Sequence, residues 1–129
     1  MTTMVCFHTA GTEYCLPVES TRGVRTAADL RAIPGTASDI AGILPGQPPL
    51  TVISVLGGAG DTGGYVLVVE SGDTTFGLLV DAVDGLRRIA ATDIRPASTG
   101  RGRSYVSGTI DMDGRLMLVA DPDALAARL

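Results

Sequence analysis

The chain has 129 residues, a net charge of −4 and 45% hydrophobic residues, with 17 glycines and 7 prolines. Its ten basic residues form no stripe, which argues against nucleic acid as a partner, because neutralising a run of phosphates needs several clustered cations. No apolar run reaches the roughly 18 residues of a membrane span, and the N-terminus lacks the regions of a signal peptide. We expect one cytoplasmic domain over residues 1–129, without membrane insertion, built from two small halves.

The first predicted element is a β-hairpin. Residues 4–9 and 13–18 alternate apolar and polar side chains on either side of a turn at residues 10–12. Pairing about this turn places Cys6 opposite Cys15. The two thiols are a redox pair, half of a metal site, or small apolar residues in neighbouring strands. We favour the last interpretation, because buried cysteine is common.

The middle of the chain alternates strand patterns with turns. Its extended or strand-forming segments are, in order, residues 19–25, 38–44, 50–56, 65–70, 74–83 and 84–89. The segments around residues 65–89 are the densest β-forming region. A glycine-rich loop at residues 57–64 precedes them.

A second hairpin and a helix are predicted at the C-terminal end. Residues 105–111 and 115–120 flank Asp113-Gly114, a strong hairpin signal because glycine tolerates positive φ. Asp121 is placed to cap a final helix, and Pro122 occupies its first position. About nine short strands and one helix predict an all-β barrel or sandwich.

Two glycine-containing motifs invite a chemical interpretation. Residues 57–60 suggest a phosphate-binding loop, but neither Gly-Lys-Ser/Thr nor a helix start follows them. Asp61-Thr62-Gly63 has the letters of the aspartic protease active site, so a small homodimeric hydrolase that uses Asp61 is the alternative to a binding module. That triplet ordinarily follows an apolar strand, whereas glycines precede it here. A ligand-sensing barrel with the glycine loop as its lid is a third hypothesis.

The remaining candidates for chemistry are sparse. Residues 111–114 resemble the start of a calcium loop but lack its distal Glu, so a hairpin turn is favoured. His8 is the only histidine, and neither a metal site nor a catalytic triad can be assembled around it. Asp81 and Asp84 could form an acid–base pair, but strand-end and turn positions suit them better. We therefore expect no catalytic residue, cofactor or metal.

The order of several segments resembles the CheW family, which comprises the chemotaxis adaptor CheW and the CheW-like regulatory domain of the histidine kinase CheA. The best match is residues 76–83, Phe-Gly-Leu-Leu-Val-Asp-Ala-Val, which is close to the family's G-L-L-V-D-x-V. The resemblance runs from about Met4 to Leu125. Its supporting segments are Phe7 with the following turn and residues 14–18, 33–35, 40–43, 52–53, 105–108 and 114–121.

The resemblance implies two small SH3-like five-stranded β-barrels packed together, a short C-terminal helix, and a bridge between the barrels at residues 76–83. It also implies a non-enzymatic adaptor that couples chemoreceptors to a CheA-type histidine kinase. The implied partners are the regulatory domain of the kinase and the cytoplasmic tip of a chemoreceptor. The family's N-L-R-G motif, whose arginine is tied to receptor coupling, is replaced by Ile43-Leu44-Pro45-Gly46, without Asn or Arg.

By the same resemblance, three groups of residues are candidate partner contacts. They are Arg22, Gly23 and Val24, then Ile43, Leu44, Pro45 and Gly46, and finally Val83, Leu86 and Arg87. For the apolar members, an ordinary place in the core is the alternative interpretation.

Overall fold

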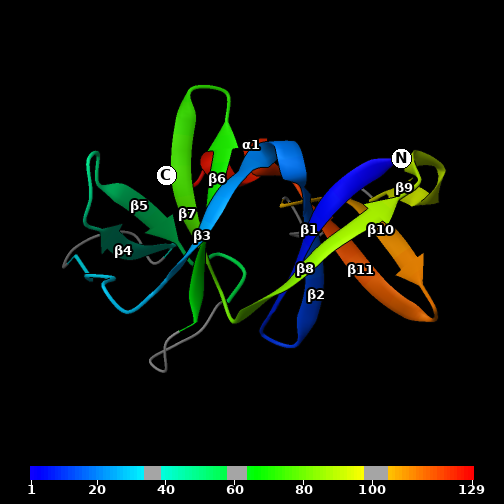
Figure 1. The fold of residues 1–129 in the computed structure, drawn as a ribbon, viewed down its shortest axis with the longest axis horizontal. Helices are drawn as coiled ribbons and strands as arrows, with labels where there is room; N and C mark the ends of the chain where they lie inside the picture. Colours follow the sequence, from blue (N-terminus) through cyan, green and yellow to red (C-terminus); the bar gives the residue numbers. More distant parts are fainter. Residues whose placement is uncertain (34–38, 58–63, 98–104) are drawn as a thin grey trace.

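The computed structural model describes residues 1–33, 39–57, 64–97 and 105–129. These residues form eleven strands in two sheets and one short α-helix (Figure 1). The predicted all-β class with a C-terminal helix is therefore confirmed. The two sheets lie side by side along the long axis of the molecule, and they are the two halves that the resemblance implied.

The first sheet contains both chain ends and six strands. In spatial order these are β8 (Ala82–Ile89), β1 (Thr2–Thr9), β2 (Thr12–Pro17), β11 (Arg115–Ala120), β10 (Val106–Met112) and β9 (Ile94–Pro96). The predicted N-terminal hairpin is present, with Cys6 directly opposite Cys15. The predicted turn between β10 and β11 is also present, since Asp113 and Gly114 both have positive φ. A parallel pairing of β2 with β11 joins the two hairpins.

The second sheet contains five strands from the middle of the chain. In spatial order these are β3 (Thr21–Thr26), β6 (Tyr65–Ser71), β7 (Thr74–Val80), β5 (Leu50–Ile53) and β4 (Ile40–Leu44). A short 3₁₀ turn, η1 (Val18–Ser20), connects β2 to β3. The pairings among the described residues leave both sheets open, so the halves are sheets of six and five strands rather than closed five-stranded barrels.

The best-matched stretch of the sequence crosses from one sheet to the other. It forms β7 in the second sheet and β8 in the first. The strand expected to continue to Val83 ends at Val80, because Asp81 is tied to the β1–β2 turn. Its backbone N–H donates to the carbonyl oxygen of His8 (3.2 Å), and its carboxylate accepts from the backbone N–H of Ala10 (2.9 Å). Asp81 is thus a structural residue at the crossover.

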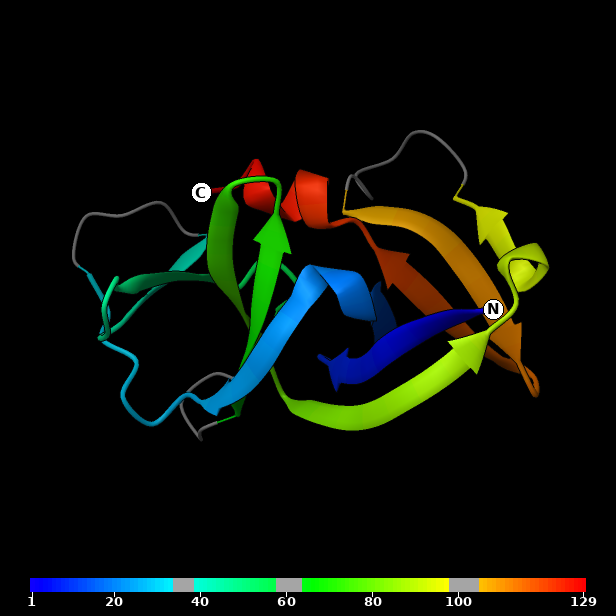
Figure 2. The same ribbon diagram turned by 45° about the horizontal axis from the view of Figure 1, so that its top comes forward.

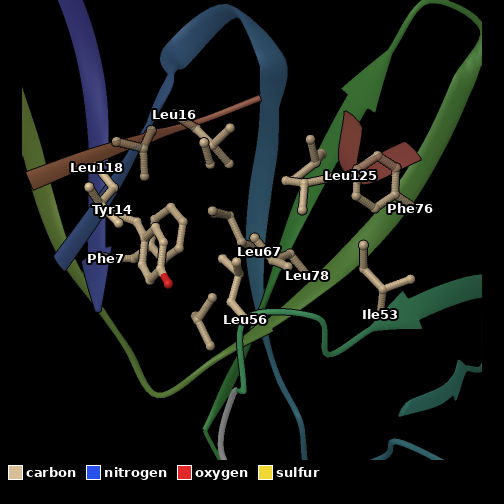
Figure 3. Packing of buried hydrophobic residues seen from close by; sticks show 14 residues of the cluster. Phe7, Tyr14, Leu16, Ile53, Leu56, Leu67, Phe76, Leu78, Leu118 and Leu125 are labelled. Carbon is tan, nitrogen blue, oxygen red and sulfur yellow. The ribbon is translucent and has the colours of Figure 1, made fainter. Parts of the chain in front are cut away.

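Both sheets contribute to one shared hydrophobic core. Phe7 and Tyr14 of the first sheet stack with ring centroids 5.6 Å apart, and they face Leu67 and Leu78 of the second (Figure 3). Burial of such side chains stabilises by roughly 1.5–3 kcal/mol each, so the packing of the sheets on each other is a large part of the stability.

The C-terminal helix packs across the junction of the two sheets. α1 (Pro122–Ala126) begins after Asp121, whose carboxylate accepts from the backbone N–H of Asp123 (3.0 Å). Leu125 is fully buried in the shared core, and Ser71 of β6 donates to the Asp123 carboxylate. α1 therefore connects β11 of the first sheet to β6 of the second. Within the described residues, no helix is long and apolar enough to cross a membrane.

Candidate functional site

Two of the three candidate groups meet at an apolar groove between the sheets. β3 and β8 run along the same side of the molecule, one in each sheet (Figure 2). The cavity between them has a volume of about 200 Å³. Apolar atoms make up almost all of its lining, which comes from four strands and the turn η1: Val5, Val18, Thr21, Gly23, Val24, Leu67, Val83, Gly85 and Leu86.

Two apolar side chains stand out from the walls of this groove. Val24 on β3 is 46% exposed and Leu86 on β8 is 67% exposed. An exposed leucine or valine alone is ordinary, but two that flank one apolar groove form a continuous surface. Such a surface can bind the apolar side chains of a protein partner.

Each wall owes its shape to a β-bulge. In β3 the register shifts between Thr21 and Gly23, and in β8 it shifts opposite the Cys6–Phe7 step. One extra residue stands in each strand at these points, Arg22 in β3 and Asp84 in β8. The following glycines have φ of 154° and 129°, which suits a residue without a Cβ. Bulges twist a strand and re-aim its side chains, so they open the two edges toward the groove.

The side chains of the two bulge residues contact polar partners beside the groove instead of lining it. Arg22 donates to Glu70 at 2.6 Å, and this hydrogen bond lowers the pKa of Glu70 below its usual range. Asp84 lies 3.0 Å from Nδ1 of His8. Asp81 and Asp84 therefore have separate hydrogen-bond partners, the Ala10 backbone N–H and His8.

Arg87 lines a second cavity, which Val83 does not line. That cavity has a volume of about 390 Å³ and lies on the other side of β8. Gly85 and Leu86 line both cavities, so Leu86 forms the ridge between them. Of the third candidate group, the structure thus brings Val83 and Leu86 to the groove and leaves Arg87 outside it.

The second candidate group lies far from the groove, on the outer edge of the second sheet (Figure 1). Leu44 is fully buried with Val52, Val66 and Leu79, which makes it a core residue and not a contact. Ile43 exchanges two backbone hydrogen bonds with Arg31. Pro45 and Gly46 are exposed in the turn that follows β4.

The other motifs supply no further site. Asp61, together with the rest of the glycine-rich loop at residues 58–63, lies outside the described residues. Across the described part of the chain, no three His, Cys, Asp or Glu side chains gather closely enough to hold a metal ion.

Several groove residues were not predicted from the sequence. Val5, Val18 and Leu67 read as ordinary core residues, because strand alternation cannot tell which apolar face remains uncovered. The bulge in β8 did leave a local signal. Asp84-Gly85 is a turn-like pair inside a run of strand residues, which is typical of a bulge.

Comparison with known proteins assigns this two-sheet domain to a family. The family model described as CheW-like domain matches residues 3–129, so the chain belongs to the CheW-like domain family. A solved structure with the same fold is that of the scaffolding protein TtCheW from Thermoanaerobacter tengcongensis. It matches with a TM-score of 0.82 and 22% sequence identity, over 93% of this chain and 88% of that one. No curated protein sequence matches this chain.

Proposed function

We propose that this chain is a non-enzymatic adaptor of chemotaxis-type signalling, which couples chemoreceptors to a CheA-type histidine kinase in the cytoplasm. Membership of the CheW-like family supports this role. The observation that carries it is the apolar groove between the sheets, with Val24 and Leu86 exposed on its walls. An adaptor needs surfaces that hold partners and no reacting groups.

The groove is the proposed docking site for the tip of a chemoreceptor, which is a helical hairpin. An amphipathic helix binds a hydrophobic groove through apolar side chains spaced by about one turn. Leu86 is the proposed central contact, since it stands on the ridge that β8 forms. The Arg22–Glu70 ion pair and the contact of His8 with Asp84 would border the docking site and stay hydrated.

The regulatory domain of the kinase is the proposed second partner. It would bind outside the groove, because one surface cannot hold both partners at once. Ile43, Pro45, Gly46 and Arg87 remain predicted partner contacts, without an assignment to one of the two partners. We also propose that residues 1–129 act as one domain, since both sheets and α1 share one core.

Binding titrations with two matched leucine variants test the groove. Leu86→Glu places a charge on the groove wall, and Leu116→Glu makes the same change on β11, at a leucine of similar exposure (60%) outside the groove lining. Loss of a central apolar contact costs about 2 kcal/mol or more, so Leu86→Glu should weaken receptor-hairpin binding by more than tenfold. Leu116→Glu should bind as the unchanged chain does. Equal affinities for both variants would remove the groove as the docking site.

The kinase contact has its own test. The unchanged chain should form a complex with a CheA-type regulatory domain at micromolar concentrations, and the complex should survive Leu86→Glu. Absence of that complex would contradict the adaptor role in this form. The hydrolase alternative has no support from the family match or the structural similarity. Peptidase signals that are the same for the unchanged chain and Asp61→Asn would remove it.

A further inference from the structure

The two cysteines of this chain face each other across the β1–β2 hairpin, and the proposed adaptor role uses neither of them. Cys6 is directly opposite Cys15 in the register of the two antiparallel strands. Directly opposite side chains project from the same face of a sheet, and both cysteines belong to the same hydrophobic cluster. Both are free and buried. A facing pair of free thiols is the arrangement from which an intramolecular disulfide can form.

The turn of the hairpin decides which kind of cross-strand pair the cysteines form. Ala10 and Gly11 have φ of 51° and 79°, as in a two-residue turn of type I′. Such a turn is closed by hydrogen bonds between the two residues that flank it. Hydrogen-bonded and non-hydrogen-bonded pairs then alternate, so Cys6 and Cys15, three pairs further along, form a non-hydrogen-bonded pair. The Cα atoms of such pairs are about 4.5 Å apart, within the roughly 4.4–6.8 Å that disulfides span.

The thiol of Cys6 is turned toward β2, the strand that carries Cys15. It donates to the thioether of Met117 on β11, with the two sulfur atoms 4.0 Å apart. Since β2 lies between β1 and β11 in the sheet, this contact requires the Cys6 side chain to lean across β2. The Cys6 sulfur is thus directed toward the strand of its prospective partner.

A cavity gives a reagent access to Cys6. This residue lines the cavity of about 390 Å³ on the other side of β8. Its neighbour on β8 is Gly85, which has no side chain to cover the thiol. Cys15 is fully buried and, among the described residues, is not part of that lining. The two thiols therefore differ in access, because Cys6 can meet a reagent from solvent and Cys15 is reached through Cys6.

Burial affects the rate of disulfide formation more than its direction. Burial raises the pKa of Cys6, although Arg87 acts in the opposite direction, and burial raises the pKa of Cys15 to about 12. Since the thiolate is the attacking species, thiol–disulfide exchange should be slow at neutral pH. Two thiols and one disulfide are both uncharged, so an apolar cluster can hold either state without a buried charge.

We propose that Cys6 and Cys15 are a modification site, at which a low-molecular-weight disulfide of the glutathione class converts the two thiols into one reversible intramolecular disulfide. The Cys6 thiolate attacks one sulfur of the oxidant, the S–S bond of the oxidant breaks, and one small thiol leaves. The Cys15 sulfur then attacks the Cys6 sulfur of this mixed disulfide and displaces the second small thiol. The protons of the two cysteines pass to the two released thiols, and two electrons reduce the oxidant. In a reducing cytoplasm the pair stays as thiols, so the disulfide would mark oxidising conditions.

Incubation of the full chain with oxidised glutathione, followed by mass spectrometry without reduction, tests the site. The unchanged chain should lose two hydrogen atoms, retain no glutathione, and recover both thiols on treatment with dithiothreitol. Cys15→Ala lacks the second thiol, so it should stop at the mixed disulfide and carry one glutathione on Cys6. Cys6→Ala is the matched control and should stay unmodified, because Cys15 is fully buried.

NMR of the unchanged chain gives a second readout, which does not depend on whether the variants fold. The ¹³Cβ shifts of both cysteines should move from thiol to disulfide values, while the amide spectrum remains that of a folded chain. Cysteines that stay reduced after equilibration, or that become oxidised only as the chain unfolds, would overturn the proposal. So would disulfide-linked dimers as the product, or glutathione on Cys6→Ala as readily as on Cys15→Ala, because Cys6 would then not be the residue that reacts first.

Discussion

The groove between β3 and β8 presents apolar side chains to solvent, whereas β4, at the outer edge of the second sheet, turns Leu44 inward. Leu86 is 67% exposed and Leu44 is fully buried. Both regions carry a β-bulge next to a glycine with φ of 154°, Gly23 in β3 and Gly42 in β4. The same local backbone structure, a β-bulge next to a glycine with positive φ, therefore occurs both at an exposed groove and at a buried edge.

The surroundings of the two glycines show what differs. A Cβ on Gly23 would meet no atom within 4 Å, because the bulge there faces the open side of β3. A Cβ on Gly42 would overlap the carbonyl oxygen of Arg31, which pairs with the next residue, Ile43. The bulge in β3 shapes a surface, and the bulge in β4 permits close packing. A candidate contact must therefore be judged by what surrounds it, and not by its motif.

The largest expected difference is between the two leucines. Leu44→Ala should lower the free energy of unfolding by about 2–5 kcal/mol, because it leaves a cavity among buried side chains. Leu86→Ala should change it by no more than about 0.5 kcal/mol, as usual for an exposed position. Urea denaturation of both variants measures this. A similar decrease in the free energy of unfolding for both variants would show that Leu86 is part of the core. The groove and the outer edge would then not differ in the way described.

A smaller difference is expected between the two glycines. Gly42→Ala combines backbone strain with overlap against Arg31, so we expect a loss of about 3 kcal/mol. Gly23→Ala has only the strain, so we expect a loss of about 1 kcal/mol. Thermal unfolding of the matched pair separates the two contributions. If Gly23→Ala were the more destabilising change, the bulge in β3 would be required for close packing and would not merely shape an exposed surface.

The smallest effect concerns the ion pair next to the groove. Arg22→Ala should let the pKa of Glu70 rise toward its usual value, because the hydrogen bond that lowers it is lost. A lowered carboxyl pKa contributes stability above the carboxyl's unfolded pKa, and this contribution is lost as pH falls through the folded pKa. In Arg22→Ala, the part of the pH dependence of folding stability that comes from Glu70 should therefore disappear. NMR titration of the Glu70 side chain reports the change, and Arg25→Ala, which removes a donor to Pro45, should leave it untouched.

Local features of the fold could be predicted from the sequence. Alternation and a glycine turn sufficed for the β1–β2 hairpin and its Cys6–Cys15 register, and Asp121 with Pro122 marked the start of α1. These features depend on neighbouring residues. The bridge at residues 76–83 came from the family resemblance, because periodicity alone does not say to which sheet a strand belongs.

The non-local features could not be predicted in the same way. The parallel pairing of β2 with β11 joins residues about a hundred positions apart, and it decides that Cys6 lies beside Met117. The end of β7 at Val80 depends on hydrogen bonds from Asp81 to the distant β1–β2 turn. Single-residue bulges also change which face a side chain occupies, so the alternation around Gly23 and Gly85 is misleading.

The most direct test of the groove as docking site is an NMR titration of the ¹⁵N-labelled chain with a chemoreceptor hairpin. We expect the largest amide shift changes on β3 and β8, around Val24 and Leu86, and little change at residues 40–46. Changes concentrated in β4 and its following turn, with β3 and β8 unaffected, would contradict it.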